Sequence, residues 1–240
     1  MIAVARLLRR LRRDRSGVAM TEFALSLPLV LTAGLYGTET AHLALTHMKV
    51  SQVAMHLADN ASRIGDTSTI TNRKIFESDI NDLLLGSSIQ AGRSLNFYEH
   101  GRAIISSLEV FSEAMSCAGG GCPMGNKSEG TQFIHWQRCK GKKVHASTYG
   151  DEYDSKPSGM GPSGQEITAD SGSAVIFVEV AYNYQPLISQ RFFGPTTITA
   201  ISTFTQRNNI DLTGLKQRKP LSPDAVSDCG QHTAFAPITV

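Results

Sequence analysis

The sequence lacks the short motifs that mark several common enzyme and metal-binding classes. It contains no H-E-x-x-H pair for a catalytic zinc ion, no G-x-S-x-G turn for a nucleophilic serine and no C-x2-C pair for a structural zinc ion. No internal repeat is visible either. These absences argue against zinc proteases, serine hydrolases and repeat proteins. We therefore expect no enzyme activity, no cofactor and no metal ion.

Basic side chains are absent from residues 16–48, where the only carboxylates are Glu22 and Glu39. The first 17 residues, in contrast, hold six arginines and one aspartate, a net charge of +5. Because the whole chain carries +2, the other residues carry about −3. The positive charge therefore belongs to the leader alone, and we expect no nucleic-acid partner. An arginine-rich leader directly before an apolar run is typical of a membrane signal.

The apolar run is long enough to cross a bilayer. Val18 to Thr38 is a stretch of 21 residues, close to the roughly 20 that span about 30 Å of hydrocarbon. Arginines before the run and none just after it predict a cytoplasmic N-terminus and an exported remainder. A secretory signal peptide is the alternative, but no A-x-A site stands straight after the run.

The helical pattern continues beyond the apolar run. One apolar stripe recurs at helical spacing, and polar side chains occupy the opposite face. We therefore expect a single long helix over residues 18–65, half in lipid and half amphipathic, ended by Gly65. The stripe consists of Val50, Val53, Ala54, Leu57, Ala61 and Ile64.

Residues 17–23, GVAMTEF, have the spacing G-x4-E-F at the boundary between the basic and apolar segments. With the preceding RRDRS, this segment resembles the class III prepilin-peptidase site of the TadE/TadG-like pseudopilins of tight-adherence (Tad/Flp) pilus systems. The resemblance covers the leader and the long helix. It is looser over AVIFVEVAYNYQPLI and TTITAISTFTQ.

The resemblance implies cleavage by a prepilin peptidase between Gly17 and Val18. It also implies that the carboxylate of Glu22, followed by Phe23, pairs with an N-terminal amine during subunit assembly. Glycine offers no side chain to obstruct a peptidase and resists helix formation, which suits an extended substrate. The other reading of Glu22 is an interfacial carboxylate tolerated near a helix N-terminus.

The exported part is predicted to be α+β. A second helix is expected over residues 71–86, with Thr71 as its N-cap and Gly86 as its end. Strands are expected over residues 102–111, 131–139, 174–184 and 196–205. The economical fold is pilin-like, with a helix packed on a small antiparallel sheet of about four strands. The expected organisation is a leader over 1–17, the long helix over 18–65 and an exported domain over 66–240, with long loops at 140–172 and 207–240.

Two features of the exported part could bind or cross-link. Its four cysteines favour two disulfides in an oxidising compartment, with three possible connectivities, over a metal site that recruits His135 or His145. The segment GMGPSG satisfies G-x-G-x-x-G but follows no strand, which favours a flexible loop over a nucleotide site. The cysteines are Cys117, Cys122, Cys139 and Cys229.

These observations favour a structural protein: a minor pseudopilin of a tight-adherence pilus or related secretion apparatus. It would be anchored in the bacterial inner membrane with its main domain in the periplasm, and its partners would be prepilin peptidase and other pilus-assembly subunits. One alternative is an uncut, single-pass scaffold of the envelope or a secretion machine. Another is an adhesion module that binds through residues 155–165.

Overall fold

A computed structural model describes residues 16–65, 72–112, 127–190, 194–207, 210–218 and 222–235. The chain falls into two compact units. Residues 1–45 and 185–194 make up the first, and residues 46–184 and 195–240 make up the second. The second unit thus contains the amphipathic part of the long helix together with the sheet.

Helix α2 (Ser16–Ala61) is the long N-terminal helix that the sequence predicts. It runs without interruption through the apolar stretch, although Pro28 lies inside it. In its amphipathic part every residue of the predicted stripe from Val50 to Ala61 is buried, and Ile64 is half-buried. The helix ends before Gly65, which has a positive φ of 131° in the turn that follows.

Helix α3 (Glu77–Leu95) begins and ends later than predicted. The predicted N-cap, Thr71, lies outside the described residues. The N-terminus is instead closed by Asp79, whose carboxylate accepts a hydrogen bond from the backbone N–H of Phe76 at 3.1 Å. The prediction that Gly86 ends the helix is wrong: Gly86 is helical and exposed, and burial of Ala91 and Leu95 extends the helix past it. A short helix, α4 (Phe97–His100), follows.

Four antiparallel strands form one open sheet in the order β2-β1-β3-β4. They are β1 (Gly101–Val110), β2 (Gln132–Lys140), β3 (Ala174–Asn183) and β4 (Thr197–Thr205). Each lies within one or two residues of its predicted range. In β4, Ile198 is buried while Thr197 and Thr199 are exposed. The α+β fold class is therefore correct.

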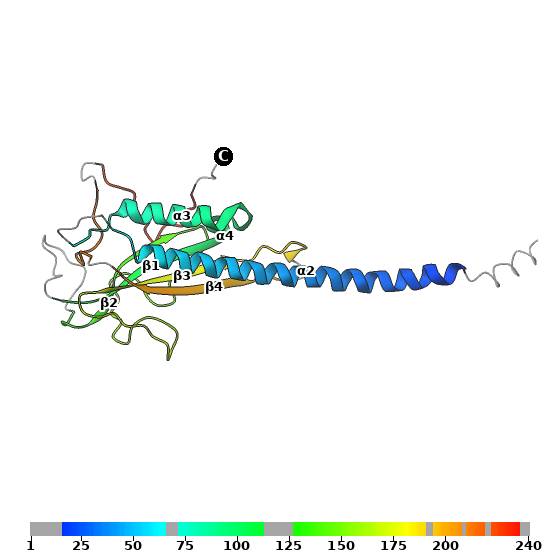
Figure 1. Cartoon of the computed structure of the whole chain (residues 1–240), viewed down its shortest axis with the longest axis horizontal. Helices are drawn as coiled ribbons and strands as arrows, with labels where there is room; N and C mark the ends of the chain where they lie inside the picture. The colour runs from blue at the N-terminus through cyan, green and yellow to red at the C-terminus, as the bar shows by residue number, and fades with distance from the viewer. Residues whose placement is uncertain are drawn as a thin grey trace, which may run out of the picture. The chain divides into compact units, whose positions relative to one another are not determined.

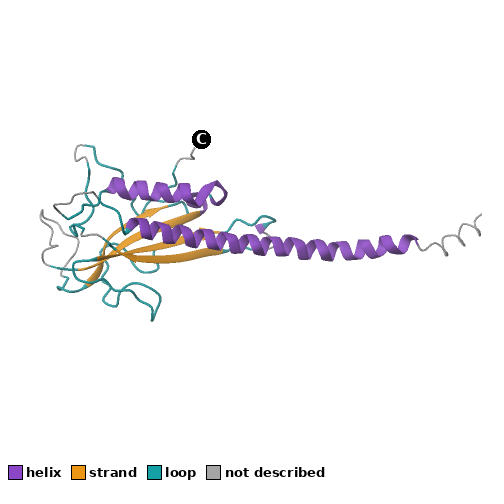
Figure 2. Ribbon diagram, viewed as in Figure 1, coloured by secondary structure: helices purple, strands orange, loops and turns teal. Residues whose placement is uncertain are grey.

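Helix α3 and the amphipathic part of α2, which belongs to the same unit, lie along one face of this sheet (Figures 1 and 2). The core on this face consists of apolar side chains from the central strands β1 and β3, which alternate along each strand as the pleat requires. The hydroxyl of Tyr182 on β3 donates a hydrogen bond to the carbonyl of Leu95 at 2.9 Å, which ties the end of α3 to the sheet. The core residues include Ala103, Ile105, Ile176, Val178 and Val180.

The opposite face of the sheet is covered by the long loop over residues 141–173. Met160 and Ala169 of this loop pack on Leu108 and Phe177 of the two central strands. The loop also runs beside strand β2, where Phe133 and Ser155 form an isolated antiparallel bridge. The predicted loop is therefore irregular, as expected, but it forms one side of the hydrophobic core.

Candidate functional site

The predicted processing residues all lie in the first turns of α2. Gly17 is helical, and a side chain at its position would meet no atom within 4 Å. Val18, Glu22 and Phe23 are exposed on the same helix. The bond between Gly17 and Val18 therefore lies in helical backbone, with open space where a side chain of Gly17 would point. A peptidase that reads an extended substrate would have to unwind this turn first.

The apolar half of α2 is exposed along most of its length in the part of the chain that the structure describes. The helix is long and apolar enough to cross a membrane, and none of its most apolar window is buried. In water such a surface is unfavourable by about 25 cal/mol per Å². Lipid or neighbouring apolar helices would remove that penalty. The exposed large side chains in this stretch include Leu25, Leu29, Val30, Leu31, Leu35 and Tyr36.

Five serine and threonine hydroxyl groups in this half are compatible with lipid because each one is bonded to the helix itself. Thr32 donates to the carbonyl of Pro28 at 2.6 Å, and Thr38 donates to the carbonyl of Gly34 at 2.9 Å. Backbonding of this kind leaves no unsatisfied hydroxyl in a medium without water. Thr21, Ser26 and Thr40 bond in the same way to carbonyls three or four residues earlier.

Glu22 is the exception among the polar groups of this half. Its carboxylate is exposed on α2, and no cation lies within ion-pair distance of it among the residues that the structure describes. A carboxylate in hydrocarbon costs on the order of 3 kcal/mol. The side chain is thus positioned to accept a cation from outside the described residues, such as an amine.

Glu39, the second carboxylate of the helix, has a different environment that sequence analysis missed. Its side chain is almost fully buried, with 1% of its surface exposed. It accepts hydrogen bonds from the backbone N–H of Leu187 at 3.1 Å and from that of Ile188 at 3.1 Å. The partners belong to the connection between β3 and β4, about 150 residues away in sequence. No local pattern could have indicated this contact.

The structure assigns one of the predicted disulfides. Cys139 on β2 is bonded to Cys229 in the C-terminal segment, across a sequence separation of 90 residues. Cys117 and Cys122 lie outside the described residues. The bonded pair removes two thiolates from the alternative metal site. Within the described part of the chain, no group of three or more histidine, cysteine or acidic side chains could hold a metal ion.

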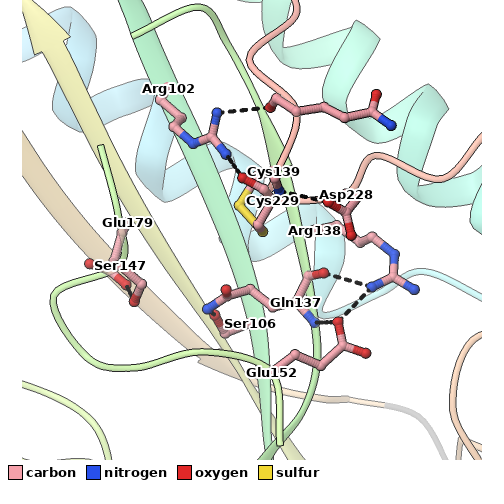
Figure 3. Close-up of a disulfide and its surroundings, with 12 residues drawn as sticks. Arg102, Ser106, Gln137, Arg138, Cys139, Ser147, Glu152, Glu179, Asp228 and Cys229 are labelled. Atoms are coloured by element: carbon pink, nitrogen blue, oxygen red, sulfur yellow. Dashed lines mark hydrogen bonds and ion pairs between the residues drawn. A yellow bond between two sulfur atoms is a disulfide. The ribbon is translucent and has the colours of Figure 1, made fainter. Parts of the chain in front are cut away.

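Arg102 on β1 holds the segment that the disulfide attaches (Figure 3). Its guanidinium is buried and donates to the backbone carbonyls of Cys229 at 2.5 Å and Gln231 at 3.0 Å. Burial lowers the pKa of Arg102, and the charge of Asp228 partly offsets this effect. Arg102 thus links β1 to the C-terminal tail through neutral backbone acceptors. Sequence analysis missed this role, because an arginine at the start of a strand gives no signal for it.

A polar cavity of about 350 Å³ lies between Arg102, Gln137 and the Cys139–Cys229 disulfide. Figure 3 shows how its side chains are bonded to one another. Gln137 donates to the hydroxyl of Ser106 at 3.0 Å, and Ser147 donates to the carboxylate of Glu179. Burial raises the pKa of Glu179, although the bonds from Ser147 and Thr148 oppose the effect. Most of these polar groups bond to one another, which is typical of a structural network, although the Nε of Arg102 is buried without a partner among the described residues.

A serine and a histidine that could suggest catalysis, Ser107 and His135, are held in a buried hydrogen-bond cluster. Ser107 and His135 are both bonded to the buried carboxylate of Glu109, at 2.5 and 2.8 Å. Because the carboxylate lies between them, the imidazole is not bonded to the hydroxyl in the way that a serine nucleophile requires. His135, named above as a candidate ligand, is thus held by Glu109. His145 lines the polar cavity.

The glycines of GMGPSG serve the geometry of a tight loop. Gly159, Gly161 and Gly164 all have positive φ values. A β-carbon at Gly159 would lie 2.4 Å from the carbonyl oxygen of Ile167, across a two-stranded bridge between Met160 and Ile167. Glycine is therefore needed here for close approach of the chain to itself. No strand precedes the segment and no helix follows it, as a nucleotide-binding turn would need.

Comparison with known proteins gave no match to a protein-family model, to a curated protein or to a solved structure.

Proposed function

We propose that this chain is a membrane-anchored structural subunit of the TadE/TadG-like pseudopilin type. Its α2 helix inserts in the inner membrane with the arginine-rich leader in the cytoplasm, and the α+β domain lies outside. Prepilin peptidase cleaves after Gly17, and the helix then packs with other pilus-assembly subunits. The protein is not an enzyme in this account.

The observation that carries the proposal is an exposed apolar helix whose carboxylate near the start, Glu22, has no ion-pair partner among the residues that the structure describes. In lipid that carboxylate needs a cation, and cleavage after Gly17 would create an amine at Val18, one helical turn from Glu22. A neighbouring subunit would present the same amine. The carboxylate of one chain and the amine of the next would then fix the axial position of the two helices.

The fold of the second unit supports the same proposal. A helix whose apolar stripe packs on a four-stranded antiparallel sheet, and whose most apolar window is not buried, is the general plan of pilin-like subunits. Such a protein is built to join a folded domain to a bundle of helices. Many of the domain's buried polar groups bond to one another, as the Glu77–Arg138 pair does, which suits a structural role.

An uncut anchor is the second candidate, and one observation favours it. The Gly17–Val18 bond lies in the helix, so cleavage requires the first turn to unwind. Glycine lowers that barrier because it is about 1 kcal/mol less favourable than alanine in a helix. In this second account Glu22 is an interfacial carboxylate that needs no partner.

The proposal is tested by Glu22→Ala in the full chain, expressed with its native assembly system. The variant should enter the membrane at the wild-type level, because it removes a charge from the apolar half. Its recovery in cross-linked complexes with pilus subunits should fall at least about tenfold, the effect of losing roughly 1.4 kcal/mol per contact.

The matched control is Thr21→Ala, which removes only the neighbouring hydroxyl bonded to the carbonyl of Val18. It should assemble like the wild type. Wild-type recovery of Glu22→Ala in the complexes would overturn the assembly role and leave the uncut anchor as the better account.

A further inference from the structure

The connection between β3 and β4 contains an unusual combination of exposed apolar side chains and satisfied backbone donors. Leu187 is 61% exposed and Ile188 is 38% exposed. Their backbone N–H groups are nevertheless both bonded to the shielded carboxylate of Glu39. The preceding residue is Pro186, which has no N–H. The backbone of Pro186, Leu187 and Ile188 therefore offers no free hydrogen-bond donor, although the side chains of Leu187 and Ile188 are exposed.

Glu39 lies directly after Thr38, the last residue of the predicted membrane span. Because consecutive residues of a helix are separated by about 1.5 Å along the axis, Glu39 marks the outer boundary of the hydrocarbon. Its hydrogen bonds hold Leu187 and Ile188 at the same level. Residues 185–190, QPLISQ, contain no charged side chain that would oppose entry into the headgroup region.

We propose that residues 185–190 form a second, interfacial membrane contact, in which Leu187 and Ile188 insert into the boundary between headgroups and acyl chains. The inference rests on the proposed anchoring of α2 in the membrane. Glu39 is the positioning residue, because it satisfies the two donors that would otherwise oppose burial in lipid. The contact would fix how deeply the anchor helix sits and would give the chain two points of attachment to the bilayer.

A lipid occupant is favoured over a protein partner by the backbone bonding. A partner chain could satisfy free N–H groups with its own carbonyls, so a protein-binding loop has no need of Glu39 as an acceptor. The acyl-chain side of the boundary, where Leu187 and Ile188 would insert, offers no acceptor. In this segment the apolar side chains are exposed and the backbone donors are bonded to Glu39. Insertion into lipid requires this arrangement.

The test uses tryptophan as a depth probe in the full chain with its disulfide intact. Leu187→Trp is reconstituted in phosphatidylcholine vesicles whose acyl chains carry bromine either close to the headgroup or close to the bilayer centre. The wild type, with only the buried Trp136, supplies the background to subtract. We expect loss of the added fluorescence with the shallow bromines, a smaller loss with the deep ones, and a shift of the emission to shorter wavelength.

Two further variants make the outcome specific. Leu29→Trp reports on the span itself and should be quenched most by the deep bromines. Ile89→Trp is the matched control, because Ile89 is also 61% exposed but lies on α3 with no bond to Glu39. It should not be quenched. Adding Glu39→Ala to Leu187→Trp should reduce the shallow quenching, because the connection loses its acceptor.

The possible results separate the two proposals. If Leu29→Trp is quenched and Leu187→Trp is not, the interfacial contact is wrong while the anchor stands. If neither is quenched, the membrane anchor itself is wrong. Shallow quenching that survives Glu39→Ala would remove Glu39 as the positioning residue.

Discussion

Cys139 on β2 and Cys229 near the C-terminus are joined by a disulfide, with their Cα atoms 4.7 Å apart. The bond does not act alone, because the backbone N–H of Cys139 donates to the carbonyl of Ser227 at 2.8 Å and that of Gly141 donates to Thr233 at 2.9 Å. The tail therefore covers part of the outer edge of β2. An edge strand covered in this way cannot pair with another chain.

Removing this disulfide should destabilise the folded domain. The double variant Cys139→Ser/Cys229→Ser is expected to lose about 2–4 kcal/mol of unfolding free energy, because a long loop of the unfolded chain is no longer closed. Urea unfolding followed by the fluorescence of Trp136, which is buried on β2, measures the change. Thr233→Ala, which removes only an exposed hydrogen bond in the same tail, should cost less than about 0.5 kcal/mol. Equal midpoints for the double variant and the wild type would contradict the structural role.

The ion pair between Glu77 and Arg138 should contribute far more than its surface counterparts. Their closest atoms are 2.5 Å apart, and the side chains are only 6% and 12% exposed. Glu77→Ala leaves the buried guanidinium with Glu152 alone and should cost about 3 kcal/mol. Glu99→Ala breaks the more exposed pair with Lys142 and should cost less than about 1 kcal/mol. Urea unfolding measures both losses of unfolding free energy. Similar losses for the two variants would contradict the expectation that the buried pair contributes more than the exposed one.

Glu179 should make stability depend on pH in a defined direction. Burial raises its pKa above the ordinary 4.5, so the folded state holds the proton more tightly than the unfolded state. The resulting stabilisation is complete below the ordinary pKa and is lost as the pH rises through the folded-state value. The stability of Glu179→Gln relative to the wild type should therefore rise with pH.

The difference in unfolding free energy between Glu179→Gln and the wild type is best measured at several values from about pH 4 to pH 8. Taking the difference cancels the titration of the other carboxylates. A difference that falls with rising pH would mean that the hydrogen bonds from Ser147 and Thr148 outweigh burial.

Gly159 should tolerate no side chain, whereas Gly164 should be less sensitive. Both have positive φ values, but only a β-carbon at Gly159 would collide with the chain. Gly159→Ala should therefore cost more than the roughly 1 kcal/mol expected from backbone strain alone at Gly164→Ala. Thermal unfolding of the two variants compares them directly. Equal losses would show that the chain around Gly159 and Ile167 shifts easily to make room for a side chain.

The sequence was sufficient where periodicity is set by the nearest neighbours along an element. The four strands were predicted because their alternation reflects the pleat, and the long helix because its apolar stripe repeats from Val50 to Ala61. The predicted end of α3 was wrong because the true end depends on Ala91 and Leu95, which are buried. The helix penalty of Gly86, about 1 kcal/mol relative to alanine, is small against that burial.

The site was only partly predictable for the same reason. Gly17 and Glu22 stand out because their spacing is local and lies at a charge boundary. Glu39 and Arg102 do not, because each is bonded to backbone groups more than a hundred residues away. Backbone acceptors and donors carry no residue-type signal, so such contacts are visible only after the chain is folded.

The mass of the mature N-terminal peptide tests the central claim most directly. In cells with an active prepilin peptidase, we expect the chain to begin at Val18, and to retain its leader when the peptidase is absent or when Gly17 is replaced by leucine. A chain that still begins at Met1 beside an active peptidase would contradict the account. So would one that begins beyond Gly37, because it would have lost both Glu22 and the anchor.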